Sequence, residues 1–289
     1  MKNINLMLIG VLCTTGTAMA QLSPVKSQFF QNPYLINPAM AAKDGASSVF
    51  INYSTMWNEI AGGPVMMAFS GSMPITDKAA IGFNHISDKA GLLKRTQSMG
   101  SFAYRILFNN DQSIRFGVSL CWAQNKIDNS LATPNGADDP ALLTYNDTRK
   151  KQWDGNFGAA YVGKNFEAQF SYLNLNYKRS MNFSTVDYST YYSSIAYKFS
   201  LDDNFTIKPL VAYRGVNGFD DQWDVAAEWG IISKDFNLYT MYHSNKSISG
   251  GFGYVYDHKL NISGFYNSEP SSVRGITGGI FDLIVGYKF

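Results

Sequence analysis

In the last nine residues of this 289-residue chain, a row of apolar side chains alternates with Asp282, Ile284, Gly286 and Lys288. The side chains of this row stand at every second position, at Phe281, Leu283, Val285, Tyr287 and Phe289. Because a β-strand has a side-chain period of two, all five point to one face. An amphipathic last strand that ends in an aromatic residue is typical of outer-membrane β-barrels, whose strands turn one face to lipid and the other to the lumen. These five residues are therefore predicted to be the carboxy-terminal signal that such a barrel presents to its assembly machinery.

The first 20 residues are predicted to be a cleaved signal peptide. Lys2 supplies a positive charge, and the apolar stretch that follows ends in small residues up to Ala20. This apolar stretch is too short to cross a bilayer as a helix. Cleavage after Ala20 would leave Cys121 as the only cysteine, so an exported chain without an internal disulfide is expected.

The composition argues against several other classes of protein. Charged residues make up only 16% of the chain, against about 25% in a typical soluble domain, and aromatic residues make up 15%. After residue 20, no apolar run reaches the roughly 18 residues that a membrane-spanning helix needs. The net charge of +2 predicts neither a nucleic-acid partner nor a polybasic membrane patch. A barrel fits all of these observations, because half of its strand residues face inward.

About fourteen segments have the alternation and the length of a strand that crosses a membrane at a tilt. We predict strands at 47–54, 65–73, 79–88, 96–107, 113–125, 152–162, 166–177, 187–199, 205–213, 223–232, 236–244, 247–257, 259–268 and 276–289. In the clearest of these segments the charged residues all take the inward parity, at Arg115, Lys208, Arg214, Asp224 and Glu228. That parity matters, because a lysine or arginine that faces lipid costs about 2–4 kcal/mol at the middle of the bilayer. We expect these side chains either to line a pore or to form a paired network that plugs the lumen.

The predicted loops are short after every second strand and mostly longer after the others. In outer-membrane barrels the short turns face the periplasm and the long loops face outside, so an even number of strands leaves both termini in the periplasm. The connection at 244–247 is the expected exception, a tight hairpin at the outer end. The chain is thus predicted to be all-β, with a signal peptide at 1–20, a periplasmic segment at 21–46 and one transmembrane antiparallel barrel at 47–289.

The segment ahead of the first strand contains two Asn-Pro pairs, Asn32-Pro33 and Asn37-Pro38, which favour turns over helix or sheet. Its large apolar residues are Phe29, Phe30, Tyr34, Leu35 and Ile36. The segment is either a periplasmic tether or an ordered piece packed into the periplasmic mouth of the barrel. The second alternative is favoured, because five large apolar side chains within eight positions are rarely left in water.

Few residues point to catalysis or to metal binding. The three histidines lie on separate predicted hairpins, so neither a metal site nor another cofactor is expected. His85 and Ser87 share the outward face of one strand, as a serine and a histidine do in outer-membrane phospholipases, but the Asn-Gly that follows the serine in those enzymes is missing. Asp128, Asp138 and Asp139 lie in the longest loop without the spacing of a calcium-binding loop, so a solvated loop is expected. The chain is therefore not expected to be an enzyme.

Residues 28–42 carry the most specific motif of the chain. They resemble the amino-terminal signature of the PorP/SprF family of Bacteroidota outer-membrane proteins, an aromatic-rich run of the form Gln-x-x-x-Asn-Pro-x-x-Ile-Asn-Pro-Ala-x-Ala. The matching residues are Asn32, Pro33, Ile36, Asn37, Pro38, Ala39 and Ala41. Further positions that follow the family's pattern are Trp57, Gly63, Pro64, Asp88, Lys89 and Gly91. The resemblance covers the first half of the mature chain, whereas the second half is similar only as a barrel that ends in Tyr-x-Phe.

The resemblance implies a role in type IX secretion and gliding motility. A protein of this family is expected to support the export or the cell-surface anchoring of a large adhesin, whose carboxy-terminal domain the outer loops would hold. Its periplasmic face, including the Asn-Pro motif, is expected to contact periplasmic secretion components or peptidoglycan-associated components. Two alternatives stay open, a barrel that links the core secretion machinery and a passive porin. Apart from outer-membrane lipid, neither a cofactor nor a nucleic-acid partner is expected.

Overall fold

The computed structural model describes residues 27, 29–56, 62–109, 112–127, 152–176, 190–202, 204–216, 220–231, 235–268 and 278–289. Two short 3-10 helices, η1 (Pro33–Leu35) and η2 (Pro38–Met40), precede the strands. The strands are β1 (Ser48–Met56), β2 (Val65–Pro74), β3 (Ala79–Ala90), β4 (Leu93–Asn109), β5 (Gln112–Ile127), β6 (Gln152–Val162), β7 (Phe166–Leu173), β8 (Thr190–Tyr197), β9 (Phe199–Ser200), β10 (Thr206–Val216), β11 (Gln222–Ile231), β12 (Phe236–His243), β13 (Ile248–Tyr256), β14 (Leu260–Asn267) and β15 (Ile280–Lys288). Within these ranges, neither helix has the length and apolar character that crossing a membrane requires.

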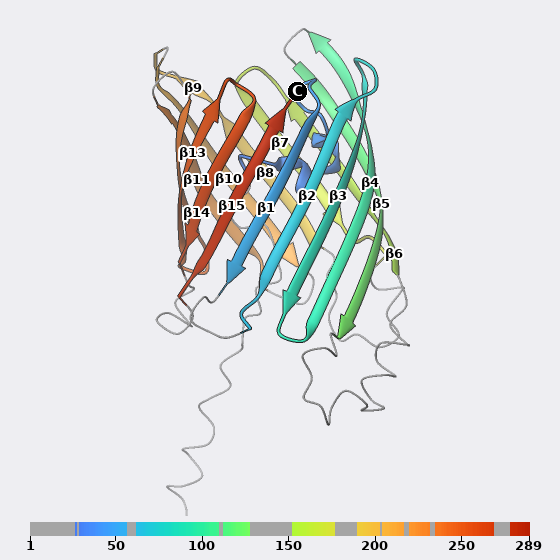
Figure 1. Cartoon of the computed structure of the whole chain (residues 1–289). Coiled ribbons are helices and arrows are strands. Elements are labelled where there is room, and N and C mark those ends of the chain that lie inside the picture. The colour runs from blue at the N-terminus through green and yellow to red at the C-terminus, as the bar shows by residue number, and fades with distance from the viewer. Residues whose placement is uncertain are drawn as a thin grey trace, which may run out of the picture.

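The strands form one closed antiparallel barrel (Figure 1). Closure comes from β1 and β15, which pair from Ser48 opposite Lys288 to Met56 opposite Ile280. β8 and β9 are two parts of one strand, interrupted at Lys198, because both pair with β10. The fifteen segments thus make fourteen strands, which confirms the predicted fold class and strand count. A closed barrel leaves no unpaired sheet edge in the lipid, where an unpaired backbone group would be costly.

Most strand boundaries differ by one to four residues from those that the alternation predicts, and β4 and β7 are two examples. β4 begins at Leu93 rather than at 96, so only Gly91 and Leu92 separate it from β3. Gly91 has a φ of +57°, which glycine adopts without strain, and this allows the tight turn. β7 ends at Leu173 rather than at 177.

The two ends of the barrel differ in their connections. The turns after β2, β4, β6, β9, β11 and β13 gather at one end, which we call the short-turn end. Phe289 lies there too, where its N–H donates to the Ser47 carbonyl oxygen (3.0 Å), and Figure 1 shows the C-terminus at the top. The opposite, long-loop end holds the longer connections together with two tight turns, the expected one at 244–247 and an unexpected one at 91–92. In outer-membrane barrels in general, short turns of this kind face the periplasm.

The outward face is apolar and carries two belts of aromatic side chains, as membrane barrels do at their two interfaces. The belt at the long-loop end consists of Tyr53, Trp122, Trp153, Tyr191, Tyr213, Trp223, Tyr242, Tyr266 and Phe281. The belt at the short-turn end consists of Tyr161, Phe166, Tyr197, Phe199, Trp229, Phe236, Tyr254, Tyr287 and Phe289. On the last strand Phe281, Leu283 and Tyr287 face outward, while Asp282 and Ile284 are buried inside, which is the predicted parity.

Candidate functional site: the occupied lumen

The residues ahead of β1 lie inside the barrel. Residues 29–42 are buried throughout, and Figure 1 shows this stretch, in blue, within the ring of strands. We call residues 29–46 the lumen segment. It extends from Phe29, whose ring lies 5.4 Å from the Arg214 guanidinium carbon, to Asp44, which pairs with Lys288 at the short-turn end. The segment predicted to be periplasmic thus occupies the lumen itself and not only its mouth.

The two Asn-Pro pairs set the shape of the lumen segment. Each proline opens a 3-10 helix, because its fixed φ suits a first helical position where its missing N–H is not needed. Asn37 caps η2, since its Oδ1 accepts a hydrogen bond from the Ala39 amide (3.0 Å). The Leu35 amide donates to the Asn32 carbonyl oxygen (3.1 Å) in the preceding turn. The family motif therefore folds as a compact double turn.

A pair of glycines on the lumen wall receives this double turn. Gly117 on β5 and Gly158 on β6 stand directly opposite each other. A Cβ atom on Gly117 would lie 2.3 Å from the Ala39 nitrogen, and one on Gly158 would lie 2.0 Å from Asn37 Oδ1. Both distances are too short for any residue other than glycine unless the segment moves. The same asparagine donates from Nδ2 to the Ala159 carbonyl oxygen (3.2 Å).

Arg115, one of the residues predicted to face inward, holds the end of the double turn. Its Nε donates to the Ala39 carbonyl oxygen (2.8 Å) and its Nη2 to the Ala41 carbonyl oxygen (2.6 Å). The side chain is buried, so the two carbonyl groups take the place of water around the guanidinium. Hydrogen bonds to a charged group of this kind contribute about 1.5–3 kcal/mol each.

Tyr34 and Asn32 fasten the first turn to β4 and β2, on the same side of the barrel as β5. The Tyr34 hydroxyl donates to Ser101 Oγ (2.9 Å), and Asn32 Nδ2 donates to Ser70 Oγ (2.6 Å). The Tyr34 ring also lies where a Cβ atom on Gly82 would be, 2.2 Å from its hydroxyl oxygen. Burial raises the pKa of Tyr34 to about 12, and the hydrogen bond to Ser101 opposes part of that rise.

The large apolar side chains of the segment fill the remaining interior. The Phe29 ring stacks on Tyr192 with centroids 5.6 Å apart, and the Phe30 ring lies 5.9 Å from that of Tyr239. Leu35 and Ile36 join the same cluster, whose wall is completed by Phe50, Ala68, Ala196, Leu210, Ala212, Ala226, Met241, Phe265 and Ile284. Full burial of one such side chain contributes about 1.5–3 kcal/mol, so the apolar contacts are the largest favourable term for docking.

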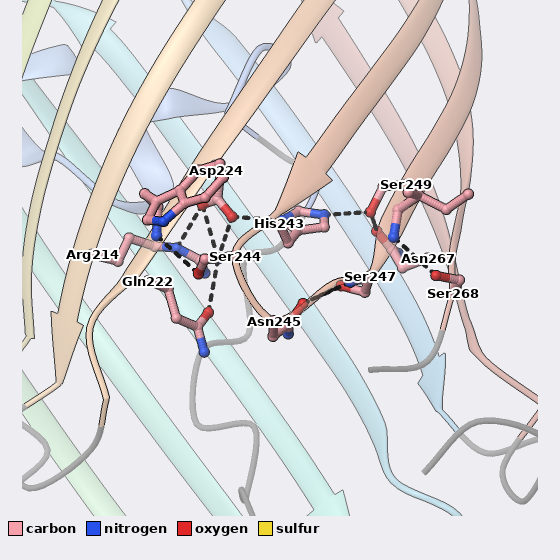
Figure 2. A network of polar contacts seen from close by, with 12 residues as sticks. Arg214, Gln222, Asp224, His243, Ser244, Asn245, Ser247, Ser249, Asn267 and Ser268 are labelled. Atoms are coloured by element: carbon pink, nitrogen blue, oxygen red, sulfur yellow. Dashed lines mark hydrogen bonds and ion pairs between the residues drawn. The ribbon is translucent and has the colours of Figure 1, made fainter. Parts of the chain in front are cut away.

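A chain of hydrogen bonds runs from strand to strand along the inner wall, from β10 to β13, near the long-loop end (Figure 2). Arg214 Nε donates to Asp224 Oδ2 (3.0 Å), and Asp224 Oδ1 lies 2.6 Å from His243 Nδ1. His243 Nε2 lies 2.7 Å from Ser249 Oγ. Arg214 and Asp224 face inward as predicted and form a buried ion pair.

The same chain continues to Ser27, which lies just ahead of the lumen segment. Ser249 Oγ donates to Asn267 Oδ1 (2.5 Å), and Asn267 Nδ2 donates to Asp282 Oδ2 (2.8 Å), which also accepts a hydrogen bond from Ser27. The carboxylate, imidazole and hydroxyl of Asp224, His243 and Ser249 have the order of a serine-hydrolase triad. Here the Ser249 hydroxyl donates to Asn267, whereas the serine of a hydrolase triad donates to the imidazole.

A second group of charges lies at the short-turn end. Lys43 Nζ is 3.2 Å from Glu167 Oε2, and Lys208 Nζ is 3.5 Å from the same oxygen. Burial alone would lower the pKa of Lys43, but the attraction of Glu167 outweighs it and the pKa is raised. Burial alone would raise the pKa of Asp44, and the neighbouring Lys43 and Lys288 lower it. These charges line a cavity of about 490 Å³, which also contains Glu228, the last of the five predicted inward charges.

The remaining residues of the family pattern lie elsewhere. Gly63, Pro64, Asp88, Lys89 and Gly91 all lie at the long-loop end, on or beside the connections after β1 and β3. The Gly91 amide donates to the Gly62 carbonyl oxygen (3.3 Å), which ties the two connections together. Trp57 of the family pattern lies outside the described residues. So do the loop aspartates that were considered for calcium binding, Asp128, Asp138 and Asp139. The structure therefore divides the pattern between the lumen and the long-loop end.

The His85 ring contacts a serine of the neighbouring strand. Its Nδ1 lies 2.9 Å from Ser98 Oγ, directly across the β3–β4 pair. No carboxylate or amide of a described residue hydrogen-bonds to its other nitrogen, as a third triad member would. In the described part of the chain, no three potential metal ligands lie together.

The wall residues that receive the segment were missed by the sequence reasoning. The sequence did not single out Gly158 or the inward alanines that pack on η2 and its neighbours, which are Ala80, Ala103 and Ala160. A signal was present, because a water-filled lumen is lined by polar side chains, whereas these inward positions are small and apolar.

Comparisons with known proteins agree with this architecture. The sequence model of the family described as "Type IX secretion system membrane protein PorP/SprF" matches residues 18–287. No curated protein sequence matches the chain. Among solved structures, the CymD monoaromatic hydrocarbon channel is similar with a TM-score of 0.54 at 12% identity, covering 92% of this chain and 93% of that one. The Acinetobacter baumannii outer membrane protein Omp33 is similar with a TM-score of 0.50 at 7% identity, covering 84% and 98%. At such identities the likeness shows the outer-membrane barrel fold alone.

Proposed function

Because the chain belongs to the PorP/SprF family of type IX secretion system membrane proteins, we propose that it is a non-enzymatic outer-membrane anchor for a large adhesin. The barrel holds the protein in the lipid, while its outer loops hold the carboxy-terminal domain of the adhesin during export or on the cell surface. Its periplasmic face contacts secretion components or peptidoglycan-associated components. The signal peptide at 1–20 directs the chain to this location, and gliding is the process that such an adhesin would serve.

The observation that carries this proposal is the occupied lumen. A passive porin needs a water-filled path through the barrel. Here Phe29, Phe30, Leu35 and Ile36 pack against the wall across that path, and Arg115 holds the double turn from the other side. A barrel filled in this way is suited to holding other proteins rather than to passing small solutes.

The long-loop end supports the adhesin part of the proposal. The connections after β1 and β3 are joined by the Gly91–Gly62 hydrogen bond, so part of this surface is held in one arrangement before any partner arrives. A surface that is already ordered loses less conformational entropy on binding. The family-pattern residues gathered there are therefore candidates for contact with the adhesin.

A second candidate function, a barrel that links the core secretion machinery, is favoured by the charged cavity at the short-turn end. The two functions differ in the end of the barrel that they use. Nothing prevents one protein from using both ends, with the adhesin outside and the machinery in the periplasm.

Deletion of the gene tests the proposal. We expect the adhesin to disappear from the surface of intact cells, as measured with an antibody, and to return when the wild-type gene is restored. Adhesin found free in the medium would indicate that the protein anchors the adhesin on the surface. Adhesin retained inside the cell would indicate that the protein supports export of the adhesin. Normal surface adhesin in the deletion strain would contradict both.

A further inference from the structure

The cavity at the short-turn end is a feature that the anchor role does not itself require. Its volume is about 490 Å³, and it lies between the lumen segment and the inner faces of the surrounding strands. The turns at 163–165 and 258–259 form part of its rim. Because short turns face the periplasm, the cavity opens there, and because it lies inside the barrel, membrane lipid cannot reach it.

Basic side chains outnumber acidic ones in the lining of this cavity. The lysines are Lys43, Lys164, Lys198, Lys208, Lys259 and Lys288, and the carboxylates are Asp44, Glu167 and Glu228. Two of the carboxylates are already engaged, because Glu167 contacts both Lys43 and Lys208, and Asp44 pairs with Lys288. The cavity therefore has an excess of positive charge that its own residues do not balance.

Three of these lysines account for the excess of positive charge. Lys164 and Lys259 lie on the turns of the rim, and Lys198 lies at the break between β8 and β9. None of the three lies within ion-pair distance of a carboxylate of another described residue, although Lys198 lies near enough to Glu228 to attract its carboxylate. Lysines converging on one opening raise the local concentration of anions and accelerate their association.

A buried donor in the same cavity is poorly satisfied. The Gln31 side chain is 9% exposed, and its Nε2 makes no hydrogen bond of ordinary geometry to a described residue, although the amide lies close enough to the Tyr239 hydroxyl to interact with it. Its Oε1 accepts from Asn261 Nδ2 (3.0 Å), which fixes the amide in place. An unpaired buried donor costs about 1–3 kcal/mol, so a ligand that brings a well-placed acceptor to this point would remove part of that cost.

We propose that this cavity binds an acidic peptide segment of a periplasmic protein. The proposal rests on the proposed function for its assignment of the short-turn face to periplasmic partners. Ammonium groups together with a poorly satisfied amide fit carboxylates, which accept strong hydrogen bonds from charged donors. The volume is that of a small-ligand site and admits a few side chains of an extended segment, not a folded domain.

Binding of labelled hexaglutamate to the purified full-length barrel tests the proposal. The variant carries Lys164→Glu, Lys198→Glu and Lys259→Glu. The matched control carries the same three charge reversals at the long-loop end, Lys94→Glu, Lys126→Glu and Lys246→Glu. Heat-modified migration on a gel verifies that each barrel is folded. We expect the wild type and the control to bind hexaglutamate in a salt-dependent manner, and the rim variant to bind at least about tenfold more weakly.

Several results would overturn the inference. These are no binding of hexaglutamate by the folded wild type, equal loss of binding in the control, and equal affinity for hexaglutamine. Equal affinity for inorganic phosphate would make the cavity a site for small anions and not for a peptide. In cells, a rim variant that displays normal surface adhesin, in a strain where deletion abolishes display, would separate the two proposals. The binding test can therefore fail while the anchor role stands, and the deletion test can fail while the binding stands.

Discussion

The glycine pair under the double turn offers the sharpest perturbation of the occupied lumen. Replacing Gly117 and Gly158 with valine places side chains where the backbone of the lumen segment now lies. Valine favours strands more than glycine does, so β5 and β6 themselves should form at least as well. Gly100→Val is the matched control, because this glycine is also on a strand, is exposed on the outer face and has no atom within 4 Å of its would-be Cβ.

The size of the effect follows from the distances. A Cβ atom at Gly117 would lie 2.3 Å from the Ala39 nitrogen, whereas ordinary contact begins at 3.4 Å, so the segment must retreat by about 1 Å. That retreat takes Asn37 out of hydrogen-bond distance of its partners, which now lie at 3.2–3.4 Å. Overpacking costs about 1–3 kcal/mol at each site, or about 2–6 kcal/mol for the pair. At 1.4 kcal/mol per factor of ten, the undocked population rises by about 30- to 20,000-fold.

Single-channel recording in planar bilayers measures this undocking. We expect the wild type and Gly100→Val to be silent, and the double variant to open in brief events. Continuous opening is not expected, because the aromatic and aliphatic anchors still favour docking by about 1.5–3 kcal/mol each. If the folded double variant is as silent as the control, the lumen segment is not what closes the barrel and the reasoning fails.

Three further predictions concern the contacts of the lumen segment and its wall. Arg115→Met leaves the Ala39 and Ala41 carbonyl oxygens without their donor, and we expect urea unfolding to show a loss of about 2–5 kcal/mol; an unchanged midpoint would refute the role of Arg115. Asp224→Ala leaves Arg214 and His243 buried without their carboxylate, which should cost about 3–5 kcal/mol, while the exposed Asp220→Ala should change stability little; equal effects would contradict the network. Tyr34 has a pKa of about 12 when folded and of about 10 when unfolded, so its contribution to stability is present below pH 10 and is lost as the pH rises toward 12. Wild-type stability should therefore fall more steeply than that of Tyr34→Phe over this range, and parallel curves would show that Tyr34 is not buried.

Much of the barrel could be predicted because the lipid imposes a strict rule on one face of every strand. A charged or polar side chain is expensive there, so the parity of residues such as Arg115 and Asp224 identifies the inner face from sequence alone. The length of β4 could not be predicted in this way. Beyond the bilayer that rule no longer applies, and strand pairing there depends on the partner strand and on the tight turn at Gly91.

The contents of the lumen were less predictable than its wall. Alternation says which side chains point inward, but it does not say whether water or another part of the chain fills the interior. The turns at Pro33 and Pro38 followed from local chemistry. The depth to which they dock depends on Gly117 and Gly158, which are 41 residues apart in the chain and meet only through pairing of β5 with β6. The aspartate–histidine–serine chain likewise joins residues from three strands that no local pattern connects.

Affinity purification of the tagged protein from native outer membranes, followed by mass spectrometry, tests the anchor role most directly. The account predicts that a large surface adhesin is recovered with the barrel in comparable molar amounts, together with periplasmic components. Recovery of the barrel alone, with steady ion conductance in a planar bilayer, would contradict it and would assign the protein to the channels.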